Sequence, residues 1–279
     1  MAPPPPSNMP LQQRLLQLAQ TLQFGWFAGH VTLLLMTFRY ALSYITFNYN
    51  SRWARFSYRT AFIAAAVTYG IVVFKSFRAR QRSGKGHGGA LAIAGDENVQ
   101  YLIMALVWLF SRQTPLAILP FAVYSIFHVA TYTRSNLLPT LQPQQSSAPG
   151  EKPKPSALAD TIGRFVKEYY DTSMTVVAVL EIALWFRLLG SAVLFQKGSW
   201  ILILLYTVFL RARFHQSTFV QGATNHLVAR GDAIANRQDM PPAVRQGWDA
   251  VKNGVRKAGE MTDINRYAQG QPQQAKKAQ

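Results

Sequence analysis

The chain contains no cysteine among its 279 residues. Disulfide bonds, thiolate metal ligands and cysteine nucleophiles are therefore excluded. Acidic residues are also scarce, because 12 Asp and Glu stand against 29 Lys and Arg and leave a formal net charge of +17. Charged residues make up only 15% of the chain and hydrophobic residues 49%, which is unusual for a soluble basic domain. The positive excess arises mostly from missing acids, and it indicates an anionic partner, either nucleic acid or membrane headgroups.

Long apolar stretches are what the chain has in abundance. Trp or Tyr lies near most of their ends, as is typical of residues at a membrane interface. A soluble protein would need amphipathic helices to cover so many buried ones, and little such sequence is present. The sequence therefore predicts an all-α, polytopic integral membrane protein, with apolar segments at Phe24–Phe47, Thr60–Phe74, Val99–Phe110, Pro115–Tyr132, Thr172–Phe186 and Gly198–Leu210.

Several of these segments are short. A straight helix needs about 20 apolar residues to cross a bilayer. Helical hairpins with shorter apolar stretches fit a thin bilayer such as that of the endoplasmic reticulum, or wedge into one leaflet. The stretches are 15, 15 and 13 residues long between the bounding charges Arg59 and Lys75, Asp171 and Arg187, and Lys197 and Arg211, and the second of them contains Glu181.

The distribution of basic residues predicts the orientation. If the segments pair as three hairpins, 22 basic residues lie on the side of both termini and 5 on the other side. Without the long tail the counts are 11 and 5. The positive-inside tendency then places both termini in the cytosol.

The remaining sequence divides the chain into regions. Ser156 and either Asp96 or Asn98 are the expected helix caps. The predicted regions are a disordered proline-rich arm (1–10), an interfacial helix plus four apolar membrane segments (11–138), a flexible linker (139–156), a lead-in helix plus two membrane segments (157–215), a cytosolic amphipathic helical tail (216–263) and a disordered end (264–279).

No grouping of residues predicts a catalytic, cofactor or metal site. The stretch SGKGHGG, Ser83–Gly89, lacks the Gly-Lys-Ser/Thr order of a phosphate-binding loop and has no preceding strand. No two histidines stand at i,i+4, so a helical metal site has no support. His128 lies in an apolar segment and is predicted to make an interhelical hydrogen bond. The sequence therefore predicts no enzyme and no cofactor.

Aromatic residues and arginines alternate between Phe47 and Arg59. Such residues can stack on bases and bind phosphates in nucleic-acid-binding proteins. Their position between two membrane segments predicts an interfacial belt instead, so no direct contact with nucleic acid is expected.

Glu181 is the one acidic residue deep in an apolar segment. Carboxylates inside a membrane are costly and often functional. Arg187 lies six residues further on, roughly 120° around the helix, so Arg39 of the first segment is the predicted partner in an intramembrane ion pair. A structural pair is favoured over the alternative, a small transporter or channel built on this carboxylate, because a transport pathway normally needs several such groups.

The stretch PPAVRQGWDAVKNGVRKAGE, Pro241–Glu260, predicts an amphipathic helix near the end of the chain. At about 100° per residue its three valines and its tryptophan fall within roughly 60°, with basic side chains along one flank. Three glycines weaken this helix, so we expect weak, reversible binding to a membrane surface, with a partner protein as the alternative. The predicted membrane-binding residues are Val244, Arg245, Trp248, Val251, Lys252, Val255 and Arg256.

Two stretches carry a family resemblance. LAILPFAVYSIFHVATYTRSNLL, Leu116–Leu138, and YTVFLRARFHQS, Tyr206–Ser217, resemble the transmembrane protein 33 family, also called the Krüppel-homologue family, which includes the perinuclear pore-membrane proteins of fungi. The most specific part runs from Pro120 through His128 to Arg134. The resemblance in layout extends across most of Leu11–Arg256.

This resemblance implies a structural protein of the endoplasmic reticulum membrane and nuclear envelope, without enzymatic activity. Members are associated with membrane curvature and tubule organisation alongside reticulon-type proteins, and with nuclear pore complex assembly or distribution. The implied partners are therefore the lipid bilayer, reticulon-type membrane-shaping proteins and nucleoporins. For the fungal members an import receptor that reads basic tail residues is also implied.

Overall fold

The computed structural model describes residues 9–82, 93–142 and 156–261, with side chains to residue 257. Every regular element within these residues is a helix, which confirms the predicted all-α fold. The chain divides into two compact units, Met1–Gln221 and Gly222–Gln279. The predicted arm at 1–10 except its last two residues, the Ser83–Gly89 loop, most of the linker and the end at 264–279 lie outside the described residues.

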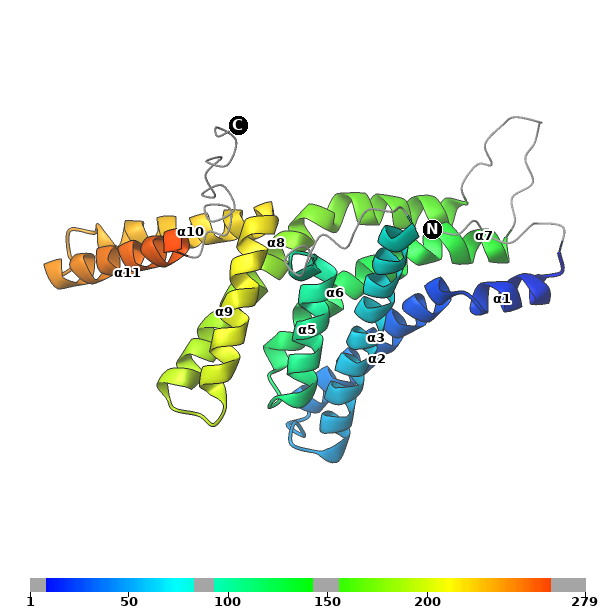
Figure 1. Cartoon of the computed structure of the whole chain (residues 1–279), viewed down its shortest axis with the longest axis horizontal. Helices are drawn as coiled ribbons and strands as arrows, with labels where there is room; N and C mark the ends of the chain where they lie inside the picture. The colour runs from blue at the N-terminus through cyan, green and yellow to red at the C-terminus, as the bar shows by residue number, and fades with distance from the viewer. Residues whose placement is uncertain (1–8, 83–92, 143–155, 262–279) are drawn as a thin grey trace, which may run out of the picture. The chain divides into compact units, whose positions relative to one another are not determined.

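The first unit is a bundle of helices drawn in blue to yellow in Figure 1. The second unit holds most of α10 (Thr218–Ala235) and all of α11 (Pro242–Met261). The bundle consists of α1 (Leu11–Ala19), α2 (Leu22–Ile45), α3 (Arg52–Arg82), α5 (Glu97–Phe110), α6 (Pro115–Tyr132), a π-helical turn (Thr133–Leu137), α7 (Leu138–Leu141), α8 (Ala157–Val193) and α9 (Ser199–Gln216).

Side-chain caps explain where several helices begin. The hydroxyl of Ser156 accepts a hydrogen bond from the Ala159 amide at 3.3 Å and starts α8. Asp96 accepts from the Asn98 amide at 2.9 Å and starts α5. Each cap satisfies a backbone N–H that has no partner inside the helix. The cap predicted at Ser156 is confirmed, and Asp96 rather than Asn98 caps α5.

The predicted interfacial helix is shorter than its apolar pattern. It ends at Ala19, because Thr21 caps a new helix by accepting from the Phe24 amide at 3.1 Å. Arg14 of α1 is buried and donates to the Thr140 carbonyl of α7 at 2.6 Å. This contact ties α1 to the far end of the α6–α7 segment.

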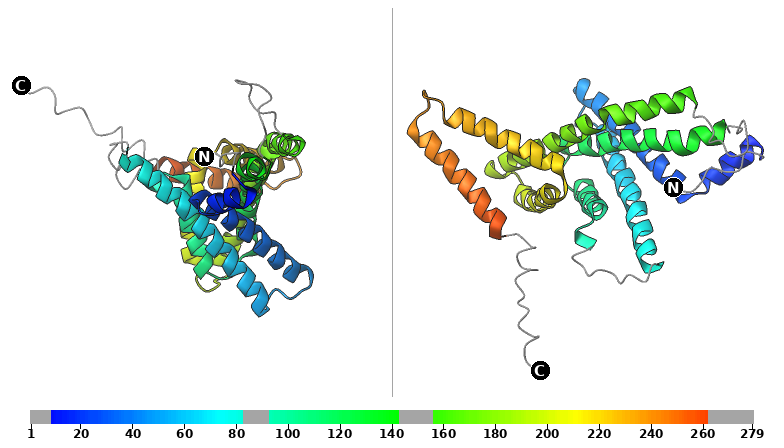
Figure 2. Two further views of the ribbon diagram at one scale, coloured as in Figure 1. Left: turned by 90° about the vertical axis from the view of Figure 1, so that its right-hand side faces the viewer. Right: turned by 90° about the horizontal axis from the view of Figure 1, so that it is seen from above.

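Three hairpins make up the bundle. The pairs α2–α3, α5–α6 and α8–α9 are joined by the short connections 46–51, 111–114 and 194–198. These connections lie at one end of the bundle, the lower end in Figure 1 and in the left view of Figure 2, which we call the hairpin-turn end. The predicted hairpins α2–α3 and α8–α9 are therefore present, whereas α5 and α6 share a short connection but pack mainly on other helices, α5 on α3 and α6 on α8 and α2. The lead-in helix and the fifth apolar segment form one continuous helix, α8, of 37 residues.

Small residues let the helices approach closely. Ala54, Ala61 and Ala65 lie on the buried face of α3, between the rings of Tyr58 and Phe62. Close approach through small side chains is how helices pack in membranes, where water supplies no driving force between them. The bundle core also includes residues of α6, α8 and α9, so the two halves separated by the predicted linker belong to one unit.

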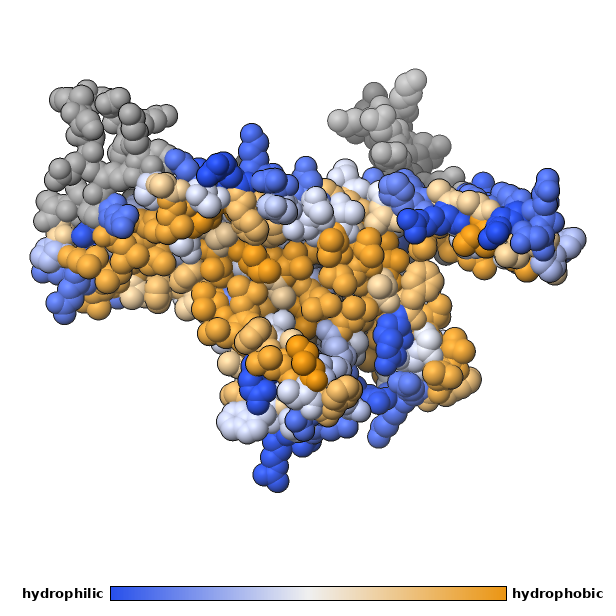
Figure 3. All heavy atoms as spheres, turned by 180° about the vertical axis from the view of Figure 1, so that it is seen from behind, coloured by the Kyte–Doolittle hydropathy of each residue, from blue (hydrophilic) through white to orange (hydrophobic). Residues whose placement is uncertain are grey.

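Within the described residues, three helices are long and apolar enough to cross a membrane by length and composition: Arg52–Arg82, Pro115–Leu141 and Ala157–Val193. The helix Glu97–Phe110 is apolar but shorter. The first two of the stretches counted between charges form only the middle parts of α3 and α8. Both helices continue through the charged turns that flank these stretches. Figure 3 shows hydrophobic side chains over much of one face of this bundle, as expected of a surface in contact with lipid.

Exposed aromatic side chains mark the hairpin-turn end. Phe47, Phe110 and Phe195 lie in or beside the three connections and are 86%, 82% and 80% exposed. Phe47 and Phe195 have φ values of 56° and 51°. This left-handed backbone conformation is the one in which a residue commonly ends a helix. One phenylalanine at each turn is consistent with a membrane interface at this end.

Candidate functional site

A buried carboxylate lies at the centre of the first unit. Glu181 of α8 is 1% exposed. The Tyr101 hydroxyl of α5 donates to its Oε1 atom at 2.5 Å, and Arg213 Nε of α9 lies 3.5 Å from its Oε2 atom. Glu181 is thus held by one aromatic donor and one cation from two other helices.

Arg213 extends this pair into a cluster. Its Nη1 atom lies 3.2 Å from a carboxylate oxygen of Glu97, and its Nη2 atom donates to the Tyr124 hydroxyl at 3.1 Å. The hydroxyls of Tyr101 and Tyr124 are 3.2 Å apart. One arginine therefore links α5, α6, α8 and α9, and its charge is shared between two carboxylates. Such a cluster is costly to break, because a remaining buried charge would lose its partner.

The predicted pair of Glu181 with Arg39 is wrong. Arg39 donates to the Ser43 hydroxyl one turn along its own helix at 2.9 Å, while Arg213 occupies the place beside Glu181. Arg213 lies beyond the last predicted apolar segment, which ends at Leu210. In the structure α9 continues unbroken to Gln216 and carries Arg213 back to the depth of Glu181.

The surroundings of Glu181 do not favour transport. The cavity beside it has a volume of about 10 Å³ and is lined mainly by aromatic and aliphatic side chains. That space is about the size of one water molecule. Among the described residues, no group of three or more His, Asp or Glu side chains could hold a metal ion. The arrangement can fix helices together, and it offers no room for a substrate.

The family motif contributes contacts inside the bundle. His30 Nδ1 and the Ser125 hydroxyl lie 2.9 Å apart, and the rings of His30 and His128 are 4.6 Å apart. The interhelical hydrogen bond predicted for His128 is therefore made by His30, with His128 packed on its ring. Arg134 lies on Gly163 of α8, where an added Cβ atom would be 2.8 Å from the guanidinium carbon.

The second unit is an antiparallel helical hairpin closed by one carboxylate. Trp248 Nε1 and Lys252 Nζ of α11 donate to the same oxygen of Asp232 on α10, at 2.8 Å and 2.6 Å. Gly231 makes room for the indole ring, because a Cβ atom there would lie 2.3 Å from Trp248 Cζ2. The hydrogen bond from Lys252 lowers the pKa of Asp232 most, and the bond from Trp248 lowers it further. The same bond to Asp232 raises the pKa of Lys252. We call these four residues the tail latch.

The contacts of the tail latch divide the predicted membrane-binding residues into some that stay exposed and some that are bound within the hairpin. Helix α11 forms as predicted, and Val244, Val251 and Val255 are 45%, 57% and 69% exposed. Trp248 is instead turned onto α10 and half-buried. Arg245 Nε donates to the Ala235 carbonyl at 3.5 Å, and Arg256 donates to Asn253 at 3.4 Å.

The apolar face of the hairpin includes residues of both helices. Leu227 and Ile234 of α10 are also exposed and stand seven residues apart, on one side of their helix. In each helix the exposed apolar residues precede the residues of the latch by a rotation of roughly 60° to 90°. Because the two helices run antiparallel, equal rotations bring both sets to the same side of the hairpin. The α11 half of this face was predicted from the sequence, and the α10 half was not.

A family model described as "Transmembrane protein 33/Nucleoporin POM33" matches residues 4–260. The chain belongs to this family. The resemblance inferred from the sequence is therefore confirmed, and the match extends from within the proline-rich arm to the end of the tail helix. Membership of the transmembrane protein 33 family and the apolar helices together identify the chain as a polytopic membrane protein.

Three relatives show the range of similarity. "Nucleoporin POM33" of Chaetomium thermophilum is 55% identical over 279 residues, which cover 97% of each chain. "Tetra-spanning protein 1" of Schizosaccharomyces pombe is 32% identical over 253 residues, 90% of this chain and 88% of the relative. "Pore membrane protein of 33 kDa" of Saccharomyces cerevisiae is 28% identical over 270 residues, 91% of each chain. No solved structure gives a significant match to the chain.

Proposed function

We propose that this chain is a structural protein of the endoplasmic reticulum membrane and nuclear envelope that contributes to membrane curvature, tubule organisation and nuclear pore complex assembly or distribution, without enzymatic activity. The names of two relatives, a nucleoporin and a pore membrane protein, support the nuclear pore part of this proposal. The bundle of three hairpins supports the structural part, since the polar cluster at its centre, Glu181, Arg213, Tyr101 and Tyr124, joins its helices to one another.

Both termini lie in the cytosol in this proposal. The three short connections share one end of the bundle, so the start of α2 and the end of α9 lie at the opposite end (Figure 1). The terminal side carries 22 basic residues and the hairpin-turn end 5. An excess of Lys and Arg is typical of the cytosolic side of membrane proteins.

The observation that carries the curvature proposal is the apolar face of the tail hairpin. Five exposed apolar side chains lie on it: Leu227, Ile234, Val244, Val251 and Val255. Each aliphatic side chain contributes about 1.5–3 kcal/mol when it is fully buried and less when it is half-buried. The resulting binding is weak, and it acts only because the bundle already holds the chain at a membrane.

Protein partners follow from the same arrangement. The polar side of the hairpin carries exposed basic residues such as Arg237 and Arg256, which suit an import receptor. Reticulon-type proteins and nucleoporins are proposed partners of the bundle, because they share its membrane. All three partners are ones that the family resemblance implies, and we propose them for this chain on that ground.

The experiment reconstitutes the full chain into giant vesicles that contain anionic lipid and draws narrow membrane tubes from them. Fluorescently labelled protein is expected to be several-fold denser on the tube than on the flat vesicle. Val244, Val251 and Val255 changed together to serine remove most of the α11 face and are expected to abolish this enrichment. Gln246, Ala250 and Asn253 changed to serine alter the opposite face of the same helix and serve as the matched control.

Two results would overturn the proposal. Equal density of the unaltered protein on tube and vesicle would show that the chain does not respond to curvature. Equal loss in the two triple variants would show that the helix, rather than its apolar face, is what matters. In cells, the valine variant is also expected to disturb the distribution of nuclear pores while the control variant does not.

A further inference from the structure

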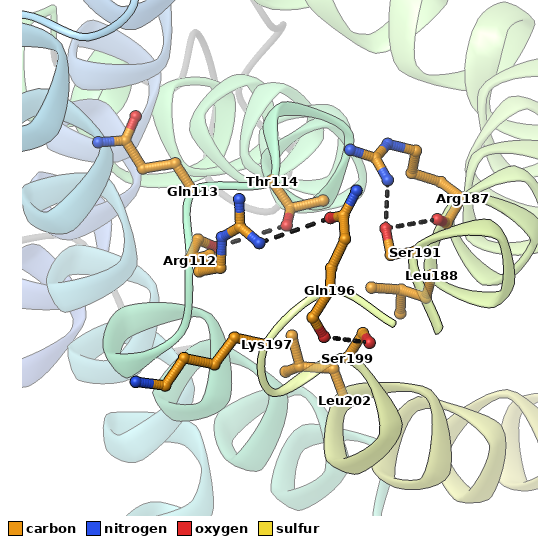
Figure 4. A pocket seen from close by; sticks show the side chains of 10 residues that line it. All are labelled: Arg112, Gln113, Thr114, Arg187, Leu188, Ser191, Gln196, Lys197, Ser199 and Leu202. Atoms are coloured by element: carbon orange, nitrogen blue, oxygen red, sulfur yellow. Dashed lines mark hydrogen bonds between the residues drawn. The ribbon is translucent and has the colours of Figure 1, made fainter. Parts of the chain in front are cut away.

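Two cavities adjoin at the hairpin-turn end of the bundle. One is a polar pocket of about 50 Å³ formed by the α5–α6 connection, the end of α8 and the start of α9 (Figure 4). The other is an open apolar groove of about 520 Å³ between the end of α2 and the start of α6. Thr114 and Arg187 line both, so the polar pocket lies directly beside the groove.

The polar pocket holds cations with neutral partners. Arg112 donates to the Gln196 side-chain oxygen at 3.5 Å, and Arg187 donates to the Ser191 hydroxyl. Figure 4 shows both guanidinium groups directed toward the space above Gln196, whereas the ammonium group of Lys197 points away from it. None of the residues lining the pocket is acidic, and the connections 46–51, 111–114 and 194–198 contain no Asp or Glu. The positive charge here has no counter-charge from the surrounding described residues.

Two helices also begin at the polar pocket. Thr114 precedes α6 and Gly198 precedes α9, and neither provides a side-chain hydrogen bond to the first turn. The first amide groups of a helix carry a partial positive charge and favour a nearby anion. This contribution adds to that of Arg112 and Arg187, so the pocket is suited to a phosphate group.

The groove has the opposite character. It is lined mainly by apolar and aromatic side chains, among them Tyr40, Ala41, Ile45, Leu116 and Leu119. Its volume lies within the range of about 300–1,000 Å³ that is typical of sites for small organic ligands. An apolar groove on a membrane-embedded surface is suited to a hydrocarbon chain.

We propose that the polar pocket and the groove together bind one anionic glycerophospholipid, with its phosphate between Arg112 and Arg187 and an acyl chain along the groove. A phospholipid is the ligand that places a phosphate next to a long hydrocarbon chain, which is the order of the two cavities. The exposed phenylalanines of the three hairpin turns lie at the same end, as expected where headgroups meet the hydrocarbon region. The site belongs to the leaflet at the hairpin-turn end and is independent of the tail hairpin.

The test uses the full chain, purified in mild detergent, stripped of lipid and analysed by native mass spectrometry. Dioleoyl phosphatidylinositol is the probe, and dioleoylglycerol, which has the same chains without phosphate, is the comparison. One phosphatidylinositol per chain is expected, with at least about tenfold higher affinity than dioleoylglycerol. Equal affinities for the two lipids would overturn the phosphate site without the need for any variant.

Variants separate the two halves of the site. Arg112 and Arg187 changed together to glutamine are expected to lower the affinity for phosphatidylinositol about tenfold. Arg52 and Arg55 lie at the same end but line neither cavity, so their double change to glutamine is the control and is expected to leave affinity unaltered. Equal losses in the two double variants would reduce the effect to general surface charge and overturn the proposal.

Ala41→Trp tests the groove separately. Ala41 is exposed, so the indole can fill the groove without disturbing the core, and phosphatidylinositol binding is expected to fall severalfold. Full binding in this variant would overturn the acyl-chain half of the proposal. Complete displacement of the lipid by millimolar inorganic phosphate would show an anion site that does not need a lipid, and would overturn it as well.

Discussion

A carboxylate held between one aromatic donor and one basic side chain occurs in each unit of this chain. Glu181 is bound by Tyr101 and Arg213 inside the bundle, and Asp232 is bound by Trp248 and Lys252 in the tail hairpin. The chemistry is alike, but Glu181 is surrounded by apolar side chains and Asp232 is reached by water. A buried charge cannot exchange its protein partner for water, so the same set of contacts is essential in the bundle and adjustable in the tail.

The largest effect is expected from Arg213→Ala, which leaves Glu181 buried without its cation. Loss of one partner of a buried pair costs about 3–5 kcal/mol of unfolding free energy. The measurement is denaturation of the purified chain with a harsh detergent. Changing Glu181 to glutamine and Arg213 to methionine together removes both charges and is expected to restore most of the loss. No recovery in this double variant would show that the contacts of Arg213 with Tyr124 and Glu97, rather than the balance of charge with Glu181, carry the effect.

Glu181→Gln alone is expected to cost less, about 1–2 kcal/mol, because the amide oxygen still accepts from Tyr101 and Arg213 keeps Glu97. The same detergent titration measures it. This variant also separates a structural pair from a transport site. Proteoliposomes are expected to show no proton or ion flux with either the unaltered chain or the variant. Flux that is present in the former and absent in the latter would contradict the structural interpretation.

In the tail, Gly231→Ala is the most disruptive single change expected. The new methyl group would lie 2.3 Å from the Trp248 ring, so the indole must leave its place on α10. Overpacking of this kind costs about 1–3 kcal/mol, and hydrogen exchange of the α10 and α11 amides measures its local effect. Gly247→Ala has open space around it and is expected to protect α11 instead. Equal protection in the two variants would contradict the latch geometry.

The smallest effect is expected from Asp232→Asn, because water and salt ions can take over the exposed partners of this carboxylate. Faster exchange of α11 amides at low salt, and little difference at high salt, is the expected result. The folded hairpin lowers the pKa of Asp232, so its contribution is fully present above the ordinary carboxyl pKa and is lost as the pH falls through the lowered value. Opening of the hairpin on alkalisation through neutral pH would contradict this sign.

Much of the bundle could be predicted from the sequence, because apolar length and flanking charge are local properties. Each of the apolar stretches became a helix, and the cap at Ser156 follows from its position alone, whereas position left Asp96 and Asn98 as alternatives. The side chains that pair between helices were harder to predict, because they depend on which helices lie side by side. A fold about the α8–α9 turn near Gln196 brings Glu181 opposite Arg213, and counting outward from that turn would have favoured Arg213 over Arg39.

The tail shows why one amphipathic pattern is not enough. The helical period predicts which side chains of α11 share a side, but it does not show which of them a neighbouring helix covers. Trp248 stands at the edge of the valine stripe nearest α10, and Gly231 provides the space for its ring. A glycine in one helix and a tryptophan in the next, across a short connection, could have suggested this contact, which the pattern of α11 alone does not contain.

The three exposed phenylalanines of the hairpin turns have a consequence for how the chain adapts to bilayers of different thickness. Trp53 and Trp200, exposed beside two of the same turns, fix the height of that end of the bundle together with these phenylalanines, because indole rings favour the headgroup level and phenyl rings favour its apolar side. The helices α3 and α8 continue through charged turns at their opposite ends, where long basic side chains can shift between depths. A change in bilayer thickness is therefore taken up on the side of the termini, and the hairpin turns stay level with one surface.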